Sequence, residues 1–264
     1  MKISSKNITL IKLGGSIITD KDIPYKAKVN VIKRLAKEIK NSGLTSLILA
    51  HGSGSFGHTS AQKYGGKKGY KSKLGIAKVA RDAMEINRIV MDNLIEEGLP
   101  VVSLRPMSMM MANAGKLKNN LFEVVDETLS QGLIPVVYGD VIWDKKWKST
   151  IYSGETTLNE ISLYLLEKGY KINKIIQVGK TNGVYDFKNK TLSLISKKNW
   201  NEIKKYFFKN KRADVTGGMQ HKIEIALNIA KIGISTLLIN GNKTNELLNA
   251  ILGKTVKGTI IKIC

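Results

Sequence analysis

The chain has 264 residues, 42% of them hydrophobic, and a single cysteine at the last position. This composition is typical of a folded protein, no apolar run approaches the ~20 residues that cross a bilayer, and the first residues lack the apolar core of a signal peptide. With one cysteine no internal disulfide can form, which favours a reducing, cytoplasmic location.

The net charge is extreme, because 43 Lys+Arg stand against 21 Asp+Glu and give +22. Such a charge attracts nucleic acid, anionic membranes or phosphorylated small molecules. The lysines are spread along the whole chain, however, and no basic tail, zinc-finger spacing or aromatic RNA-binding signature accompanies them. We therefore expect mostly solvated lysines and an anionic small-molecule substrate, with nucleic-acid binding as the weaker alternative.

Apolar runs of β type alternate with segments of helical period. The alternation predicts an α/β protein with a mostly parallel sheet. The expected strands cover residues 8–13, 47–50, 101–104, 134–138, 174–178, 235–240 and 259–263. The expected helices cover residues 29–39, 76–94 and 155–167, and a segment that follows Gly217-Gly218 and ends at Gly233.

Two segments interrupt the alternation. Residues 116–123 indicate a short hairpin or loop insert, and residues 141–154 alternate apolar and polar side chains as a β-hairpin does. No linker divides the chain, so two lobes would share one continuous sheet, with a boundary near residues 169–173.

Glycine and a charged or hydroxyl residue follow nearly every expected strand. In open α/β sheets, ligands collect at the carboxyl ends of the strands. Glycines let backbone N–H groups approach phosphate oxygens, helix N-termini favour anions, and lysines supply charge. The pattern therefore predicts a polyphosphate site. Its segments are Lys12 to Ser16, Thr19 to Lys21, His51 to His58, Gly139-Asp140, Ser153 to Glu155, Gly179 to Gly183 and Asp214 to Met219 with Lys222.

Lys12 carries the most specific of these signals. It lies between Ile11 and Leu13 inside an expected strand, where a lysine is costly unless its ammonium reaches a polar site. We expect it to point into the site.

The segment HGSGSFGH contains the spacing of a dinucleotide-binding turn, Gly52-x-Gly54-x-x-Gly57. That fold needs an acidic residue about 20 positions later, at the end of the next strand. Residues 59–79 contain lysines and no acid, and no strand is expected there. The Walker A pattern is also absent. The loop therefore holds a different phosphate.

In combination, these segments resemble the amino acid kinase superfamily, and most closely its archaeal-type isopentenyl phosphate kinases. His58 is the specific residue, since other branches keep the glycines and lack this histidine. The matching blocks run in family order: IKLGGSIITDK, HGSGSFGH, IPVVYGDVIWD, SGE, NGVY, DVTGGMxxK and ING…LLxAILGxxVxGTxI.

The resemblance implies a three-layer αβα sandwich with an acceptor lobe (residues 1–170) and an ATP lobe (residues 171–264) on one sheet. It implies the Mg²⁺-dependent reaction of ATP with isopentenyl phosphate in a mevalonate-type isoprenoid pathway, carried out by a homodimer. Implied catalytic residues are Lys12, Lys21, His58, Glu155 and Lys222. Implied ATP-binding residues are Lys12, Gly14, Gly15, Ser16, Lys21, Gly179, Lys180, Gly183, Tyr185, Asp214, Gly217, Gly218 and Lys222.

The acceptor side follows from the same resemblance. A phosphate-monoester acceptor is largely dianionic at neutral pH because its second pKa is about 6, so we expect His58 to donate a hydrogen bond to it and not to act as a base. Methionines suit an apolar tail, and residues 107–112 fall where the family places a helix beside the acceptor. Implied acceptor-binding residues are Gly52, Ser53, Gly54, Gly57, His58, Gly154, Met107 and Met111. Mg²⁺ is expected to be carried by ATP, without protein ligands.

Two departures from the family pattern bear on the site. Glu155 stands where the family has the aspartate that orients the two catalytic lysines, and Lys180-Thr181-Asn182 replaces acidic residues near the nucleotide. A kinase of another small phosphate or phosphonate, such as fosfomycin, and a basic nucleic-acid-binding protein on the same fold are the alternatives.

Overall fold

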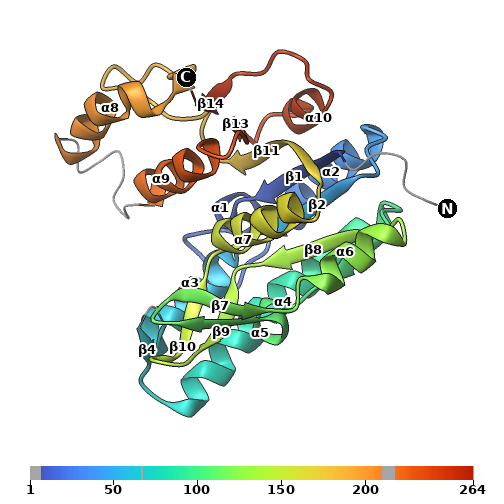
Figure 1. Ribbon diagram of the computed structural model, residues 1–264, viewed down its shortest axis with the longest axis vertical. Helices are drawn as coiled ribbons and strands as arrows, with labels where there is room; N and C mark the ends of the chain where they lie inside the picture. The colour runs from blue at the N-terminus through green and yellow to red at the C-terminus, as the bar shows by residue number, and fades with distance from the viewer. Residues whose placement is uncertain (1–6, 67, 210–217, 264) are drawn as a thin grey trace.

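The centre of the molecule is one eight-stranded sheet, seen in a computed structural model that describes residues 7–66, 68–209 and 218–263. Its strands are parallel except where β13 meets β14 (Figure 1). In spatial order they are β12 (Leu194–Ile195), β14 (Gly258–Ile261), β13 (Thr236–Asn240), β11 (Lys171–Gly179), β1 (Asn7–Leu13), β2 (Leu47–His51), β8 (Ile134–Tyr138) and β5 (Val101–Ser103).

Helices cover both faces of this sheet and give the αβα sandwich that the sequence predicted. One apolar core joins the sheet to α1 (Gly15–Ile18), α2 (Val29–Asn41), α3 (Gly54–Tyr64), α4 (Lys73–Glu96) and α10 (Glu246–Ile251). The other joins it to α6 (Glu123–Ser130), α7 (Gly154–Glu167) and α9 (Gly218–Ala230). Within β1, Ile11 and Leu13 enter the first core and Leu10 the second.

A separate four-stranded sheet has the order β10-β9-β6-β7. The predicted hairpin over residues 141–154 is confirmed as β9 (Asp140–Asp144) and β10 (Lys148–Tyr152). Residues 116–123 contribute β7 (Lys116–Asn120), which pairs with β6 (Met110–Asn113). The buried Asp144 carboxylate accepts four backbone N–H groups from the two turns, which fixes them to each other.

The methionine run corrects one expectation. The helix is only α5 (Pro106–Met109), and Met110 to Ala112 are strand. Methionine and alanine favour helices, but here β6 pairs with both β7 and β9, and Met110 and Ala112 alternate into the core. Tertiary pairing therefore overrides local propensity.

Several further elements were not expected from the sequence, among them the helices α3, α6 and α10. A two-residue hairpin, β3 (Gly65–Gly66) with β4 (Gly69–Tyr70), lies between α3 and α4, outside the main sheet. The strand β12 and the helix α8 (Lys197–Lys209) lie between β11 and α9. The hairpin shows that residues 59–79 do contain short strands. The dinucleotide interpretation still fails, because these strands are not part of the main sheet and no acidic residue follows the glycines.

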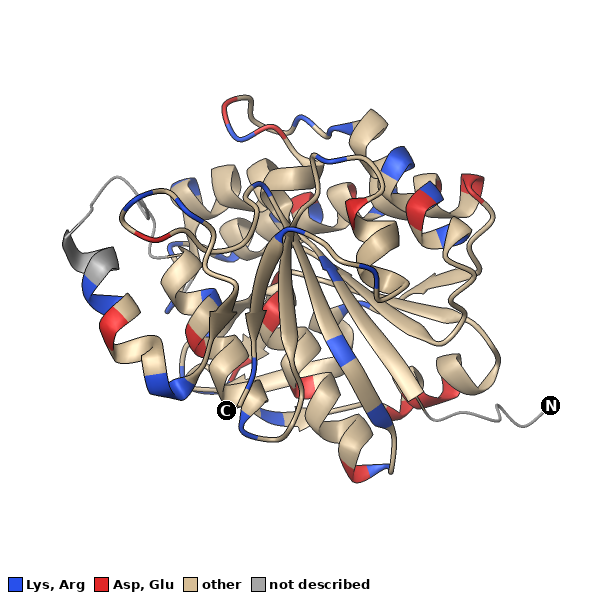
Figure 2. Cartoon of the chain, turned by 90° about the horizontal axis from the view of Figure 1, so that it is seen from above, with Lys and Arg blue, Asp and Glu red and all other residues tan. Residues whose placement is uncertain are grey.

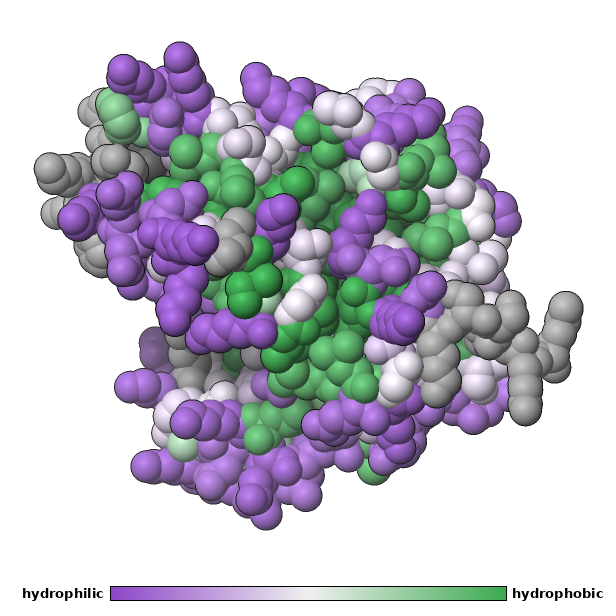
Figure 3. All heavy atoms as spheres, turned by 45° about the horizontal axis from the view of Figure 1, so that its top comes forward, coloured by the Kyte–Doolittle hydropathy of each residue, from purple (hydrophilic) through white to green (hydrophobic). Residues whose placement is uncertain are grey.

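The positions of charged residues are scattered along the chain, mostly on helices and loops (Figure 2). Hydrophobic side chains gather across the middle of the face in Figure 3, with hydrophilic ones along its margins. No helix in the described residues is long and apolar enough to cross a membrane.

Candidate active site

Lys12, Glu155 and Lys222 meet where β1 ends, and each comes from a different element. The Lys12 side chain leaves β1 on the α7 side of the sheet and is 5% exposed; its Nζ donates to Oε1 of Glu155. Glu155 stands in the first turn of α7, where Ser153 caps the helix by accepting the Thr156 backbone N–H. Nζ of Lys222, on α9, lies 3.9 Å from the same carboxylate oxygen. The predicted Lys12, Glu155 and Lys222 are thus brought together.

The charges of the two lysines control the Glu155 carboxylate. Burial by itself raises the pKa of Glu155, but Lys12 and then Lys222 outweigh burial and lower that pKa to about 2. The carboxylate is therefore ionised at neutral pH and holds both ammonium groups. The extra methylene of glutamate, relative to the family aspartate, does not prevent contact with either lysine.

The glycines that follow β1 and β2 pack against each other. A Cβ on Gly15 would lie 2.7 Å from Cα of Gly54, and a Cβ on Gly52 would lie 2.8 Å from the Gly15 nitrogen. A Cβ on Gly154 would meet the carbonyl of His51. At these positions glycine is required for close approach of backbone to backbone, in addition to any contact with phosphate.

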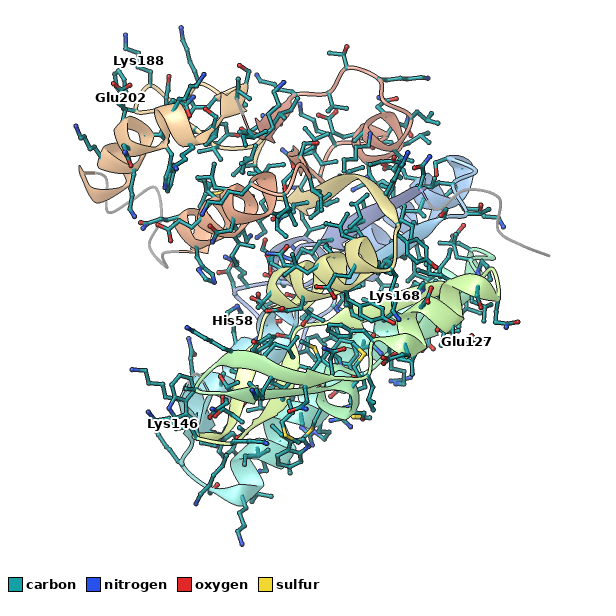
Figure 4. The ribbon with its side chains drawn as sticks, viewed as in Figure 1. His58, Glu127, Lys146, Lys168, Lys188 and Glu202 are labelled. Atoms are coloured by element: carbon teal, nitrogen blue, oxygen red, sulfur yellow. The ribbon has the colours of Figure 1, made fainter. Side chains whose placement is uncertain are left out.

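His58 lies on the exposed side of α3, between α7 and the four-stranded sheet (Figure 4). Partial desolvation and then the charge of Lys21 lower its pKa below the ordinary value, so the imidazole is neutral at pH 7. Lys21 itself is exposed in the segment after α1. The predicted Lys21 and His58 are therefore close enough for the charge of Lys21 to affect the imidazole. Among the described residues no hydrogen bond occupies the His58 ring, which leaves its one N–H available to a ligand.

A small apolar cluster lies between α4, β9, α5 and the β3–β4 hairpin. Its buried members are Val79, Ala80 and Val141, and Met107 packs against them. Met111 is half-buried and pairs with Trp143, on the β9 face that Val141 shares. In contrast, Met109 and Met110 belong to the core between the sheet and α6, α7 and α9. Met109 and Met110 are therefore core residues, whereas Met107 and Met111 lie near the cluster of Val79, Ala80 and Val141.

Several of the predicted ATP residues follow the carboxyl ends of β1 and β11. Gly14 donates its N–H to the Val178 carbonyl, and a Cβ there would lie 2.7 Å from that oxygen. Gly183, with φ of +90°, packs on Thr259 of β14. Ser16 is half-buried in α1, Lys180 and Tyr185 are exposed, and Gly218 is the first residue of α9. The predicted Asp214 and Gly217 lie outside the described residues.

Two cavities lie along this side. One of about 20 Å³ is lined by residues of β1, β11, β13 and α9, namely Lys12, Gln177, Val178, Gly179, Thr181, Met219, Lys222, Leu238 and Ile239. An open one of about 620 Å³ is lined by Asn182, Tyr185, Asn189, Lys190, Thr191 and Lys257.

Asp140 is a buried carboxylate that sequence reasoning named without a role. It accepts from Arg105 Nε (3.3 Å) and from the backbone N–H of Met107 (3.4 Å) and Val141 (2.8 Å). Burial raises its pKa to about 6, against the opposing effect of Arg105. The carboxylate thereby fastens α5, with Met107, to β9. The signal in the sequence was its place directly after Gly139 at a strand end.

Comparison with known proteins agrees with this geometry. The model of the amino acid kinase family matches residues 7–240. The isopentenyl phosphate kinase of Methanocaldococcus jannaschii is 34% identical and covers 96% of this chain and 98% of its own, and that of Methanothermobacter thermautotrophicus is 32% identical with the same coverage. An X-ray structure of isopentenyl phosphate kinase superposes with a TM-score of 0.81 at 30% identity, covering 96% of this chain and all of its own. The chain therefore belongs to the amino acid kinase family of phosphotransferases, in its isopentenyl phosphate kinase branch.

Proposed function

We propose that this protein transfers the γ-phosphoryl group of ATP to isopentenyl phosphate and releases isopentenyl diphosphate and ADP, as a step of a mevalonate-type isoprenoid pathway. The observation that carries the proposal is the convergence of Lys12 and Lys222 on the buried Glu155 carboxylate at the end of β1. Two cations fixed beside the glycine loops suit a reaction between two anions, in which repulsion is the main obstacle.

Positioning and charge neutralisation provide the catalysis. An oxygen of the acceptor phosphate attacks the γ-phosphorus in line, and the bond from that phosphorus to the β,γ-bridging oxygen breaks as ADP leaves. Lys12 and Lys222 neutralise the transferring group, and Lys21 acts at the β- and γ-phosphates. The acceptor is already a dianion, so no proton has to be removed and His58 serves as a hydrogen-bond donor.

Each glycine loop binds a different substrate phosphate. Gly14, Gly15 and Ser16 face the nucleotide phosphates, and Gly52, Ser53, Gly54 and Gly57 with Gly154 surround the acceptor phosphate. The mutual packing of Gly15 with Gly52 and Gly54 supports this division, because it holds the two loops side by side and so brings donor and acceptor phosphates close together.

Mg²⁺ enters this proposal as the counterion of ATP. Among the described residues, no group of three or more His, Cys, Asp or Glu side chains could hold a metal ion, and Glu155 is already held by lysine. Mg²⁺ commonly keeps several waters and binds substrate phosphates, which fits a lysine-lined site. When bound, it would neutralise the phosphate oxygens of ATP.

The apolar cluster around Val79, Ala80 and Val141 supports an alkyl tail on the acceptor. Half-buried Met107 and Met111 lie near it and would contact the tail. A polar phosphonate such as fosfomycin would gain little from such a surface.

We assign residues 1–170 to the acceptor and residues 171–264 to ATP, and we propose a cytoplasmic homodimer with small-molecule substrates and without a nucleic-acid partner. The scattered charge in Figure 2 supports the last point. Light scattering tests the dimer, and the salt dependence of DNA and RNA binding tests the partner assignment.

An ADP-release assay decides among the acceptors. Isopentenyl phosphate, dimethylallyl phosphate, fosfomycin and UMP are compared at equal concentrations. We expect isopentenyl phosphate to give the highest kcat/KM. Turnover of another acceptor with isopentenyl phosphate at background would refute the proposal.

A further inference from the structure

His51 is a buried histidine at the end of β2, one residue before the glycines of the acceptor loop. The residue is 1% exposed, and its ring stacks on Tyr138 at a centroid distance of 5.4 Å and an interplanar angle of 10°. Its Nδ1 lies 3.2 Å from the Gly52 carbonyl oxygen, and its Nε2 lies 3.1 Å from Oδ1 of Asn87, on α4. Nδ2 of Asn87 in turn donates to the Ser103 hydroxyl at 2.8 Å.

Hydrogen-bond arithmetic sets the protonation of this network. Burial lowers the pKa of His51, and the charge of Lys12 adds to that effect, so the ring is neutral and carries one N–H. Oδ1 of Asn87 can only accept, which places the ring proton on Nε2, and Nδ2 of Asn87 donates to the Ser103 hydroxyl. The side-chain link of His51 therefore runs through Asn87 to Ser103.

The backbone carbonyl of His51 also contacts Gly139, after β8, and Gly154, at the start of α7. The carbonyl oxygen accepts the Gly139 N–H at 3.0 Å, and a Cβ on Gly154, next to Glu155, would meet that oxygen. The backbone of His51 therefore contacts the start of α7 and leads directly into the acceptor loop. Its side chain ties them to α4, whose first turns carry Val79 and Ala80 of the apolar cluster.

We propose that His51 is a positioning residue. Through Asn87 it fixes the distance between the phosphate loop and the helix that contacts the acceptor tail. This inference rests on the proposed function, because it concerns an acceptor with both a phosphate and an apolar tail. When the link is intact, binding of the tail places the phosphate in line with ATP. When it is broken, the tail still binds, but the phosphate is misaligned.

The test compares Asn87→Ala with Asn93→Ala. Asn93 is a matched control: it is a buried asparagine on the same helix, and among the described residues its side chain donates only to the local Ile89 carbonyl. With isopentenyl phosphate, Asn87→Ala should lower kcat about tenfold with little change in KM. With methyl phosphate, which has no tail to align, kcat should not change. Ser103→Ala, at a more exposed position, should show the same pattern more weakly. Equal losses with both acceptors, or the same loss in Asn93→Ala, would overturn the proposal.

A second measurement does not depend on the acceptor. ¹⁵N NMR of the His51 ring should show a neutral Nε2–H tautomer, with an Nε2 resonance that shifts in Asn87→Ala and not in Asn93→Ala. An Nε2 resonance insensitive to Asn87 contradicts the link. If wild-type protein prefers another acceptor, the proposed function fails separately, and the kcat ratio is then measured with that acceptor against methyl phosphate.

Discussion

Lys12 and Lys222 bring the same charge to one carboxylate from two differently built parts of the molecule. Lys12 comes from the central strand β1 and its side chain is 5% exposed, whereas Lys222 comes from the second turn of α9 and is 31% exposed. Lys12 is fixed by the sheet and by Glu155, so its charge is in place without a nucleotide. Lys222 lies at the more open side, where a ligand competes with water for its ammonium. We therefore propose that the Lys12 side of the site is preorganised, and that the Lys222 side supplies its charge from a helix.

Removal of Lys12 should have the largest effect. We expect Lys12→Ala to lower kcat about 10³-fold, since it deletes a desolvated cation beside the transferring group and leaves Glu155 without its main partner. Lys174→Ala is the control, because that lysine is also on the main sheet and donates to the Ala250 carbonyl away from the site. A steady-state ADP-release assay measures both variants. Equal kcat values for the two variants would show that Lys12 has no catalytic role.

Replacement of Lys222 sharpens the comparison. We expect Lys222→Ala to lower kcat about 10²-fold, less than Lys12→Ala, because water can partly replace an exposed cation. Raised salt should lower the activity of wild-type protein toward that of the variant, since exposed charges are screened more than buried ones. If Lys222→Ala lost more kcat than Lys12→Ala at every salt concentration, Lys222 and not Lys12 would be the more important cation.

The two sides also differ in how well the sequence predicted them. Lys12 was identified from its place inside an apolar strand, and the glycine-rich strand ends led to one edge of the sheet, as found. The sequence explained Gly15, Gly52 and Gly54 by the approach of their backbone to phosphate, but these glycines also pack against each other. That contact joins two loops far apart in the sequence, so it leaves no local signal. The role of Asp140 and the link from His51 to Asn87 were missed for the same reason. The strand at Met110 to Ala112 was missed because its partners are distant.

His58 tests the acceptor side alone. His58→Ala should lower kcat/KM for isopentenyl phosphate several tens of fold, and His58→Gln should recover part of it, because an amide N–H can donate to the phosphate. KM for ATP should stay constant in both. Equally inactive variants would point to a general base.

The pH profile distinguishes the same roles. Since the pKa of His58 is lowered, its titration lies below neutral pH, and we expect kcat/KM to be constant above pH 7. The acidic limb should follow the second pKa of the acceptor, about 6, and should move when an acceptor with a different second pKa is used. An acidic limb that stays at one pH for all acceptors would assign it to the enzyme.

Glu155→Asp tests whether the longer side chain matters. We expect kcat to fall only a few-fold, because the shorter carboxylate retains Lys12 and moves away from Lys222. The pKa of Glu155 is lowered to about 2 from an ordinary 4.5, so its stabilising contribution is complete above about pH 4.5 and is lost as the pH falls toward 2. Glu155→Gln lacks this titration. Its free energy of unfolding should therefore depend less on pH between 4.5 and 2 than that of wild-type protein, as measured by denaturant titration.

The smallest effect is expected at the apolar end of the acceptor site. Met107→Ala removes a half-buried side chain that packs on the Val79 cluster, and a few buried methylenes correspond to a loss of about 1–2 kcal/mol in binding. KM for isopentenyl phosphate should rise several-fold, while kcat and KM for ATP stay unchanged, because the phosphates remain on the preorganised loops. Met109→Ala, in the core between the sheet and α6, α7 and α9, should instead lower thermal stability with little change in KM. If the two variants exchanged these effects, the tail would lie on the other face of the methionine segment.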